Sequence, residues 1–182
     1  MRHCKHLGKL ELPVLSPEDL PLVQLSNVEN RARYKHTEWL EESAPPTPLH
    51  MYALPGEVKD KILQALPRGL IAKEQPGVYF MHMPKPCVES VSLPPHVDKA
   101  RRTALNIYLK CSGEVTEFYD ADEATKTLTP VERFVAKPHD MWALDVSKPH
   151  AVLMTDAMER SAISISFRRV RYPELIAYFG EE

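Results

Sequence analysis

Glycine and cysteine are scarce in this sequence, and long apolar runs are missing. Only six of the 182 residues are glycine, and neither GxGxxG nor GxxxxGK[ST] occurs, which argues against a nucleotide-binding loop. The three cysteines are odd in number and include no C-x-x-C pair, so a reducing compartment fits better than a disulfide framework. No signal peptide or transmembrane helix is expected, because no apolar segment is long enough. These absences predict a cytoplasmic protein.

A large excess of charge of either sign is also lacking. Lys and Arg number 23 against 25 Asp and Glu, which gives a net charge of −2. The chain therefore has no overall electrostatic attraction to duplex nucleic acid or to anionic membranes, and neither is expected as a partner. The length fits one domain covering 1–182, and 43% hydrophobic residues suffice for a core. Nothing in the sequence indicates an oligomeric state.

The two halves of the chain differ in their hydrophobic periodicity. In the N-terminal part, 1–70, helices are expected at 31–42 and 55–66, and the remainder reads as irregular. In the second part, 71–182, short alternating segments separated by turns predict strands; they lie at 104–109, 115–119, 131–136, 141–146 and 162–167. The expected fold is mainly β with N-terminal helices, the β core being an antiparallel sandwich, barrel or jelly roll.

One histidine–carboxylate pair has a context that suits metal binding. With eight histidines and 25 acidic residues, about one H-x-[DE] triplet is expected by chance, and two occur. His36 and Glu38 fall in an expected helix, where residues two apart point away from each other. His96 and Asp98 precede a strand in an extended segment, where residues two apart share a face. A further histidine would complete a two-histidine, one-carboxylate site, which leaves positions on iron(II) open.

The best candidate for the third ligand is His150. It follows an expected strand and turn, and its separation from Asp98 leaves room for about four strands. His139 is a weaker candidate, because it lies in a Pro-His-Asp turn where exposed histidines are common. The metal site predicted from the residues is therefore His96, Asp98 and His150.

Arg160 lies ten residues beyond His150 and is a candidate anchor for a cosubstrate. A cosubstrate such as 2-oxoglutarate would chelate the metal at one end and need a cation for its far carboxylate, which arginine can bind with two donors. Arg160 has the parity of Ser164 in the last strand, on the face opposite its apolar residues. Asn106 and Tyr108 lie on the polar face of another strand, where they either line the same cavity or face solvent.

These segments together resemble the 2-oxoglutarate- and iron(II)-dependent oxygenase superfamily. The matching stretches are PPHVDKARRTALNIYLK, FVAKPHDMWALDVSKPHAV and ERSAISISF, and the resemblance covers roughly 78–170. They contain H-x-D, a long gap, a distal histidine and an arginine about ten residues later, in that order. The sequence departs at Ala162, where many members have serine, and at His139, where many have a glycine in a Gly-Asp turn. The small prolyl-hydroxylase-like branch is similar, whereas the aspartyl/asparaginyl-hydroxylase-like branch usually lacks a carboxylate such as Asp98.

The resemblance implies a double-stranded β-helix, or jelly roll, that acts as a single oxygenase domain. It implies that His96, Asp98 and His150 bind iron, and that Arg160 binds 2-oxoglutarate. The strand faces add Asn106, Tyr108 and Ser164 as further candidate cosubstrate contacts. The implied reaction uses O₂, converts 2-oxoglutarate to succinate and CO₂, and hydroxylates a protein side chain, an amino acid or another small molecule; ascorbate is a candidate stimulant. The alternatives are a metal-binding cupin-like protein that does not use 2-oxoglutarate and a non-catalytic interaction module.

Overall fold

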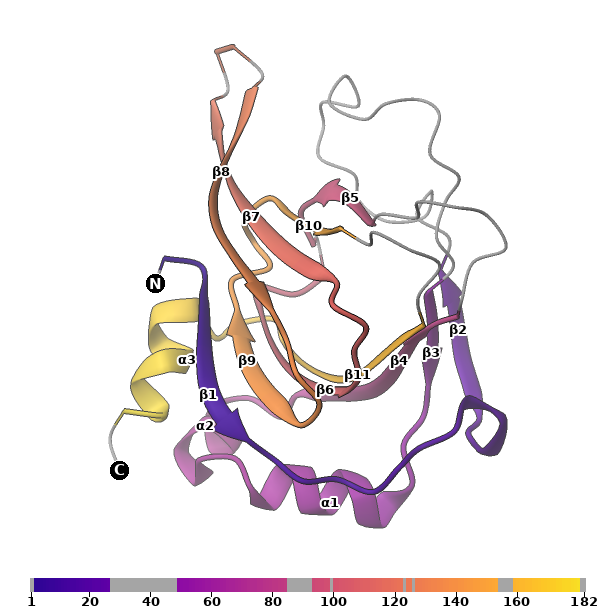
Figure 1. The fold of residues 1–182 in the computed structure, drawn as a ribbon. Helices are drawn as coiled ribbons and strands as arrows, with labels where there is room; N and C mark the ends of the chain where they lie inside the picture. The colour runs from indigo at the N-terminus through magenta and orange to yellow at the C-terminus, as the bar shows by residue number, and fades with distance from the viewer. Residues whose placement is uncertain are drawn as a thin grey trace.

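The described part of the chain is mainly β and forms two antiparallel sheets. The computed structural model describes residues 2–26, 49–84, 93–98, 100–122, 124–125, 127–153 and 159–180. The larger sheet contains, in spatial order, β1 (Cys4–Lys9), β9 (Asp140–Leu144), β6 (Thr103–Lys110), β11 (Arg160–Phe167), β4 (Gly77–Met83), β3 (Leu49–Tyr52) and β2 (Leu22–Ser26). The smaller sheet contains β5 (Leu93–His96), β10 (His150–Leu153), β7 (Val115–Asp122) and β8 (Thr127–Val135). Figure 1 shows the two sheets facing each other.

The alternating segments of the second half form strands, as predicted. Each expected segment overlaps one of the strands β6, β7, β8, β9 and β11. Strand β11 begins at Arg160, so this arginine does share the face of Ser164. Four strands, β6 to β9, lie between Asp98 and His150, which is the number that the separation suggested.

The expectation of helices and irregular chain in the N-terminal part was wrong for three segments that form strands. Strands β1, β2 and β3 come from this part of the chain, and all three belong to the larger sheet. Their hydrogen-bonding partners are distant in sequence, since β1 pairs with β9 and β3 with β4, so local periodicity does not reveal them. The helix expected at 55–66 is present as α1 (Gly56–Gln64). The helix expected at 31–42 lies outside the described residues.

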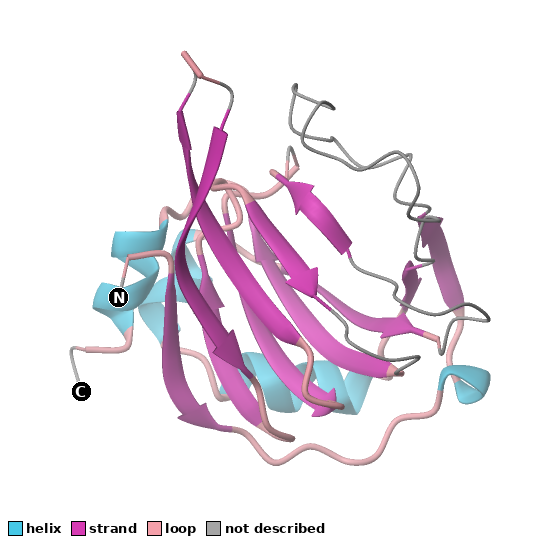
Figure 2. Cartoon of the chain, turned by 45° about the horizontal axis from the view of Figure 1, so that its top comes forward, coloured by secondary structure: helices cyan, strands magenta, loops and turns pink. Residues whose placement is uncertain are grey.

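The two faces of the larger sheet have different neighbours. Its outer face packs against α1, α2 (Arg68–Lys73) and α3 (Tyr172–Tyr178), and Ile163, Ile165 and Phe167 of β11 are buried there. Figure 2 shows these helices on the side of the larger sheet away from the smaller one. The inner face packs against the smaller sheet through a second core, which includes Tyr108 and Phe118. None of the helices within the described residues is long and apolar enough to cross a membrane.

Glu74 ties the end of β11 to the C-terminus of α2. Its carboxylate accepts backbone hydrogen bonds from Arg168, Arg169 and Val170 at 2.8, 2.8 and 3.1 Å. Partial burial on its own would raise the pKa of Glu74, but these three N–H donors outweigh it and lower the pKa below 4.5. The ionised form is therefore favoured by folding.

We expect Glu74→Gln to lower the free energy of unfolding by on the order of 1 kcal/mol at neutral pH, because the amide replaces one accepting oxygen with a donor. A carboxyl group whose pKa falls on folding stabilises the protein above its unfolded-state pKa and stops doing so as the pH falls through the lowered value. The difference between wild type and variant should therefore shrink below about pH 4.5. Urea unfolding at a series of pH values measures it, with the exposed Glu18→Gln as control. A difference that does not change with pH would contradict this role.

Candidate metal centre

His96 and His150 are brought together by neighbouring strands of the smaller sheet. His96 is the last residue of β5 and His150 the first of β10, and because the strands are antiparallel the two residues are register partners. Their ring centroids lie 4.3 Å apart. The side chains are buried, with 3% of His96 and 6% of His150 exposed. Sheet pairing therefore places the two imidazoles side by side in the protein interior.

Asp98 completes the cluster just beyond the end of β5. Its backbone N–H donates to the carbonyl of Val146 at 3.0 Å, which fixes this extended segment beside the turn that leads to His150. Its Oδ1 lies 3.7 Å from Nε2 of His96. One ligand atom from each of His96, Asp98 and His150 can be chosen so that all three lie within 4.8 Å of one another. Within the described residues this is the one group of three or more His, Cys, Asp or Glu with such spacing.

The ring of His150 is oriented by its own turn. Its Nδ1 lies 2.9 Å from the carbonyl oxygen of Lys148, and because a carbonyl only accepts, Nδ1 carries the proton in this hydrogen bond. The lone pair of the neutral imidazole is then on Nε2, which is the atom that could bind a metal. Phe118 stacks on the same ring at a centroid distance of 5.6 Å. The histidine is therefore held in both orientation and tautomer.

Arg101, which the sequence analysis did not single out, binds the second oxygen of Asp98. Its Nε donates to Oδ2 of Asp98 at 2.5 Å, and its Nη1 donates to the hydroxyls of Ser164 and Ser166 at 2.6 and 3.2 Å. Ser164, expected as a cosubstrate contact, is thus a contact of this arginine. The pattern that could have revealed Arg101 is a basic residue three positions after the carboxylate.

Arg160 lies on the inner face of the larger sheet, next to the expected cosubstrate residue Tyr108. Its Nη2 donates to the Tyr108 hydroxyl at 3.2 Å, and its Nη1 lies 3.9 Å from the sulfur of Met83. Its guanidinium carbon also lies 5.1 Å from the centroid of the Tyr108 ring. Tyr108 belongs to the same core as Phe118, which stacks on His150. Arg160 and the histidines therefore border one interior region.

Asn106 and Tyr108 of β6 were expected either to line a cavity or to face solvent, and their burial decides between these alternatives. Tyr108 is fully buried and 5% of Asn106 is exposed, so this face of β6 lines the interior rather than facing solvent. Oδ1 of Asn106 is buried and accepts no hydrogen bond from the described residues. Such an oxygen is a candidate partner for a bound molecule.

Glu114 is a second neighbour that the sequence did not reveal. Its Oε1 lies 3.1 Å from Nε of Arg160, although within the described residues neither atom forms a hydrogen bond. The contact is therefore ionic rather than directional. Burial and the charge of Glu114 raise the pKa of nearby Cys111 to about 12, although Arg160 opposes them. Cys111 is consequently a protonated thiol at neutral pH, and it takes no part in the three-residue cluster.

The rival histidine does not reach the metal centre. His139 lies in the turn before β9 with a positive φ of 69°, and its Nε2 lies 3.4 Å from Oε2 of Glu11. It takes no part in the three-residue cluster. His36 and Glu38 lie outside the described residues.

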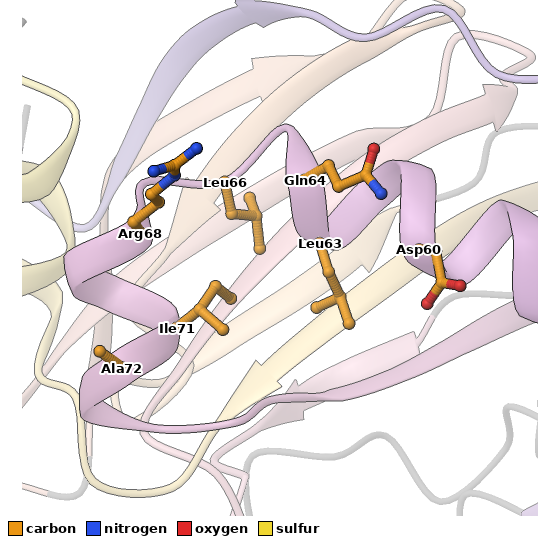
Figure 3. Close-up of a pocket in the computed structure, with 7 residues that line it drawn as sticks. All are labelled: Asp60, Leu63, Gln64, Leu66, Arg68, Ile71 and Ala72. Carbon is orange, nitrogen blue, oxygen red and sulfur yellow. The ribbon is translucent and has the colours of Figure 1, made fainter.

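A surface hollow of about 710 Å³ lies along the helices rather than at the metal centre. Figure 3 shows its lining, which comes from α1, α2 and the connection between them; the residues are Asp60, Leu63, Gln64, Leu66, Arg68, Ile71 and Ala72. The lining contains no histidine and no pair of carboxylates. The groups that can perform chemistry lie instead between the two sheets.

Comparison with known proteins bears on the fold. No family model matches the chain, and no curated protein matches it. Among solved structures, a Pseudomonas putida prolyl-4-hydroxylase is 16% identical over 78% of this chain and 79% of that chain, with a TM-score of 0.43. An oxidoreductase of the 2OG-Fe(II) oxygenase family from Burkholderia pseudomallei is 13% identical over 85% of this chain and 76% of that chain, with a TM-score of 0.50. The chain shares the fold of this oxygenase.

The shared oxygenase fold rests on the Burkholderia structure and agrees with the resemblance seen in the sequence. It extends further than that resemblance, which began near residue 78, because the match spans 85% of the chain. At 13% identity the likeness concerns the fold. The chemistry has to be argued from this chain's own residues.

Proposed function

We propose that this protein is an iron(II)- and 2-oxoglutarate-dependent dioxygenase with a double-stranded β-helix fold that acts as one oxygenase domain. The observation that carries the proposal is the convergence of two imidazoles and one carboxylate within 4.8 Å, in the protein interior. The fold shared with a 2OG-Fe(II) oxygenase supports it. A cupin-like site would usually have more histidine ligands, and the cluster has two.

Iron(II) suits this donor set. Two neutral imidazoles and one carboxylate form a facial set that leaves coordination positions for a cosubstrate and O₂. His96 and His150 would bind through ring nitrogens, and Asp98 through Oδ1, because Arg101 holds its Oδ2. When bound, iron supplies the oxidation chemistry that protein side chains lack. One atom of O₂ goes to succinate and the other to the hydroxylated substrate, and 2-oxoglutarate loses CO₂.

The chain's own residues bind and orient the cosubstrate. The Arg160 guanidinium and the Tyr108 hydroxyl would hold the far carboxylate of 2-oxoglutarate, since both are buried donors on the same face of the sheet. Oδ1 of Asn106, which has no hydrogen-bond partner among the described residues, would receive a hydrogen bond from a bound water or ligand. The surrounding apolar core limits the access of water. The substrate is a protein side chain, an amino acid or another small molecule.

The decisive experiment is an assay for succinate formed from 2-oxoglutarate by the purified protein with iron(II), O₂ and ascorbate. We expect iron-dependent turnover that cell extract stimulates, because extract supplies the substrate. Dialysis against a chelator should abolish the activity and added iron(II) should restore it. No turnover, together with no binding of 2-oxoglutarate to the iron-loaded protein, would overturn the proposal.

We expect Arg101→Gln to weaken iron(II) binding about tenfold, because groups that hydrogen-bond to metal ligands typically contribute this much or more. Without the guanidinium, Oδ2 loses the contact that fixes it, so Oδ1 is held less firmly toward the imidazoles. Competition with a fluorescent chelator measures the affinity. The adjacent Arg102 has an exposed side chain, so Arg102→Gln is a matched control. Equal iron affinity in the two variants would mean that Arg101 does not position Asp98.

A further inference from the structure

Arg160, the proposed cosubstrate anchor, already has an anionic neighbour. Glu114 lies just before β7 with 2% of its surface exposed, and its Oε1 is 3.1 Å from Nε of Arg160. The backbone N–H of Ser112 donates to the other carboxylate oxygen at 2.8 Å, which holds the side chain in place. Only 7% of Arg160 is exposed. Because both charges are buried, water screens them little. The Glu114 carboxylate therefore repels any further anion that binds Arg160.

The two sides of the guanidinium are not equivalent. Glu114 occupies the Nε side, whereas Nη1 and Nη2 contact the sulfur of Met83 and the hydroxyl of Tyr108, both of them neutral. A second carboxylate would therefore approach the Nη side, with Glu114 across the same guanidinium. Two carboxylates on opposite sides of one guanidinium lie on the order of 6 Å apart, so their repulsion offsets part of the attraction of each to the arginine.

We propose that Glu114 sets the affinity of the site for dicarboxylates: it holds Arg160 in position and weakens the binding of the cosubstrate's far carboxylate. This inference rests on the proposed function, since it takes Arg160 as the anchor of 2-oxoglutarate. Succinate keeps the same far carboxylate, so Glu114 also favours release of the product. Pyruvate has the 2-oxo acid group but no far carboxylate, so its binding does not depend on Glu114.

Calorimetric titration of the iron(II)-loaded protein under argon tests the proposal. We expect Glu114→Gln to tighten 2-oxoglutarate and succinate binding by roughly tenfold, because the like charge is removed, and to leave pyruvate binding unchanged. The matched control is Glu117→Gln, three residues further on, whose carboxylate contacts the Tyr119 hydroxyl instead. A purely structural role of Glu114 would weaken the binding of all three ligands or leave it unaltered.

Thermal unfolding gives a second readout. Without ligand, Glu114→Gln should melt below wild type, since Arg160 loses its counter-charge, and 2-oxoglutarate should raise its melting temperature more than that of wild type. If this variant does not fold, Glu114→Asp keeps the charge but withdraws it from Arg160, and should tighten 2-oxoglutarate binding about twofold.

The outcomes separate this inference from the proposed function. If wild type binds 2-oxoglutarate but neither Glu114 variant binds it more tightly, Glu114 does not set the affinity and the proposed function stands. If wild type binds no 2-oxoglutarate, the proposed function fails and the inference fails with it.

Discussion

Asp98→Ala is expected to abolish succinate formation from 2-oxoglutarate and to weaken iron(II) binding by at least about a hundredfold. Asp98 is the only carboxylate of the three-residue cluster in the described chain, so two neutral imidazoles would remain to hold a doubly charged ion. The variant also leaves the Arg101 guanidinium without its carboxylate partner at 2.5 Å. A cation at that position adds repulsion toward the metal to the loss of a ligand.

Iron content after anaerobic loading and succinate release measure the two effects separately. Asp60→Ala is a suitable control, because Asp60 is exposed on α1 and lies away from the cluster, beside the surface hollow. Wild-type turnover in Asp98→Ala would exclude this residue as a ligand. Wild-type iron content without turnover would instead assign Asp98 to catalysis rather than to metal binding.

Arg160→Gln is expected to have two separable consequences. It should weaken 2-oxoglutarate binding about a hundredfold, or roughly 3 kcal/mol, since a buried charge pair with the cosubstrate is lost. It should also destabilise the protein by about 3–5 kcal/mol, because Glu114 is left buried without its cationic partner. The pair Arg160→Gln and Glu114→Gln removes both charges and should recover most of the stability but not the cosubstrate affinity.

Urea unfolding and 2-oxoglutarate titration of wild type, the single variant and the double variant test these expectations. The exposed Arg133→Gln controls for the loss of one positive charge. If the double variant binds 2-oxoglutarate like wild type, Arg160 is not the anchor. If Arg160→Gln is as stable as wild type, the buried ion pair contributes nothing to folding.

The strands around the site could be predicted because their periodicity is local. In β11 the alternation of Ile163, Ile165 and Phe167 with small polar residues places Arg160 and Ser164 on the inner face, and the structure agrees. His96 and His150 could be brought together only by assuming that distant strands pair, which their positions beside expected strands suggested and the superfamily resemblance supported. Their register pairing is the physical fact behind that assumption.

Other features depend on contacts that no local pattern encodes. Strand β1 has little alternation, and its place in the sheet is set by pairing with β9, which follows it by more than a hundred residues. Strand β10 is short and follows Pro149, so it has no periodicity of its own. Arg101 and Glu114 become important through what they touch across the interior. The sequence predicted the candidate metal ligands and the candidate anchor Arg160. It did not predict Arg101, which contacts Asp98, or Glu114, which contacts Arg160.

Alternate residues of β11 point to opposite faces of the larger sheet, and this separation is useful for engineering. Its apolar residues lie on the helix-covered face, whereas Arg160, Ala162 and Ser164 face the region between the sheets. Changes at the first set would disturb the packing against the helices, and changes at the second would alter the surroundings of Arg160. A library restricted to inward positions, such as Ala162, can therefore vary the region between the sheets while the packing against the helices is left untouched.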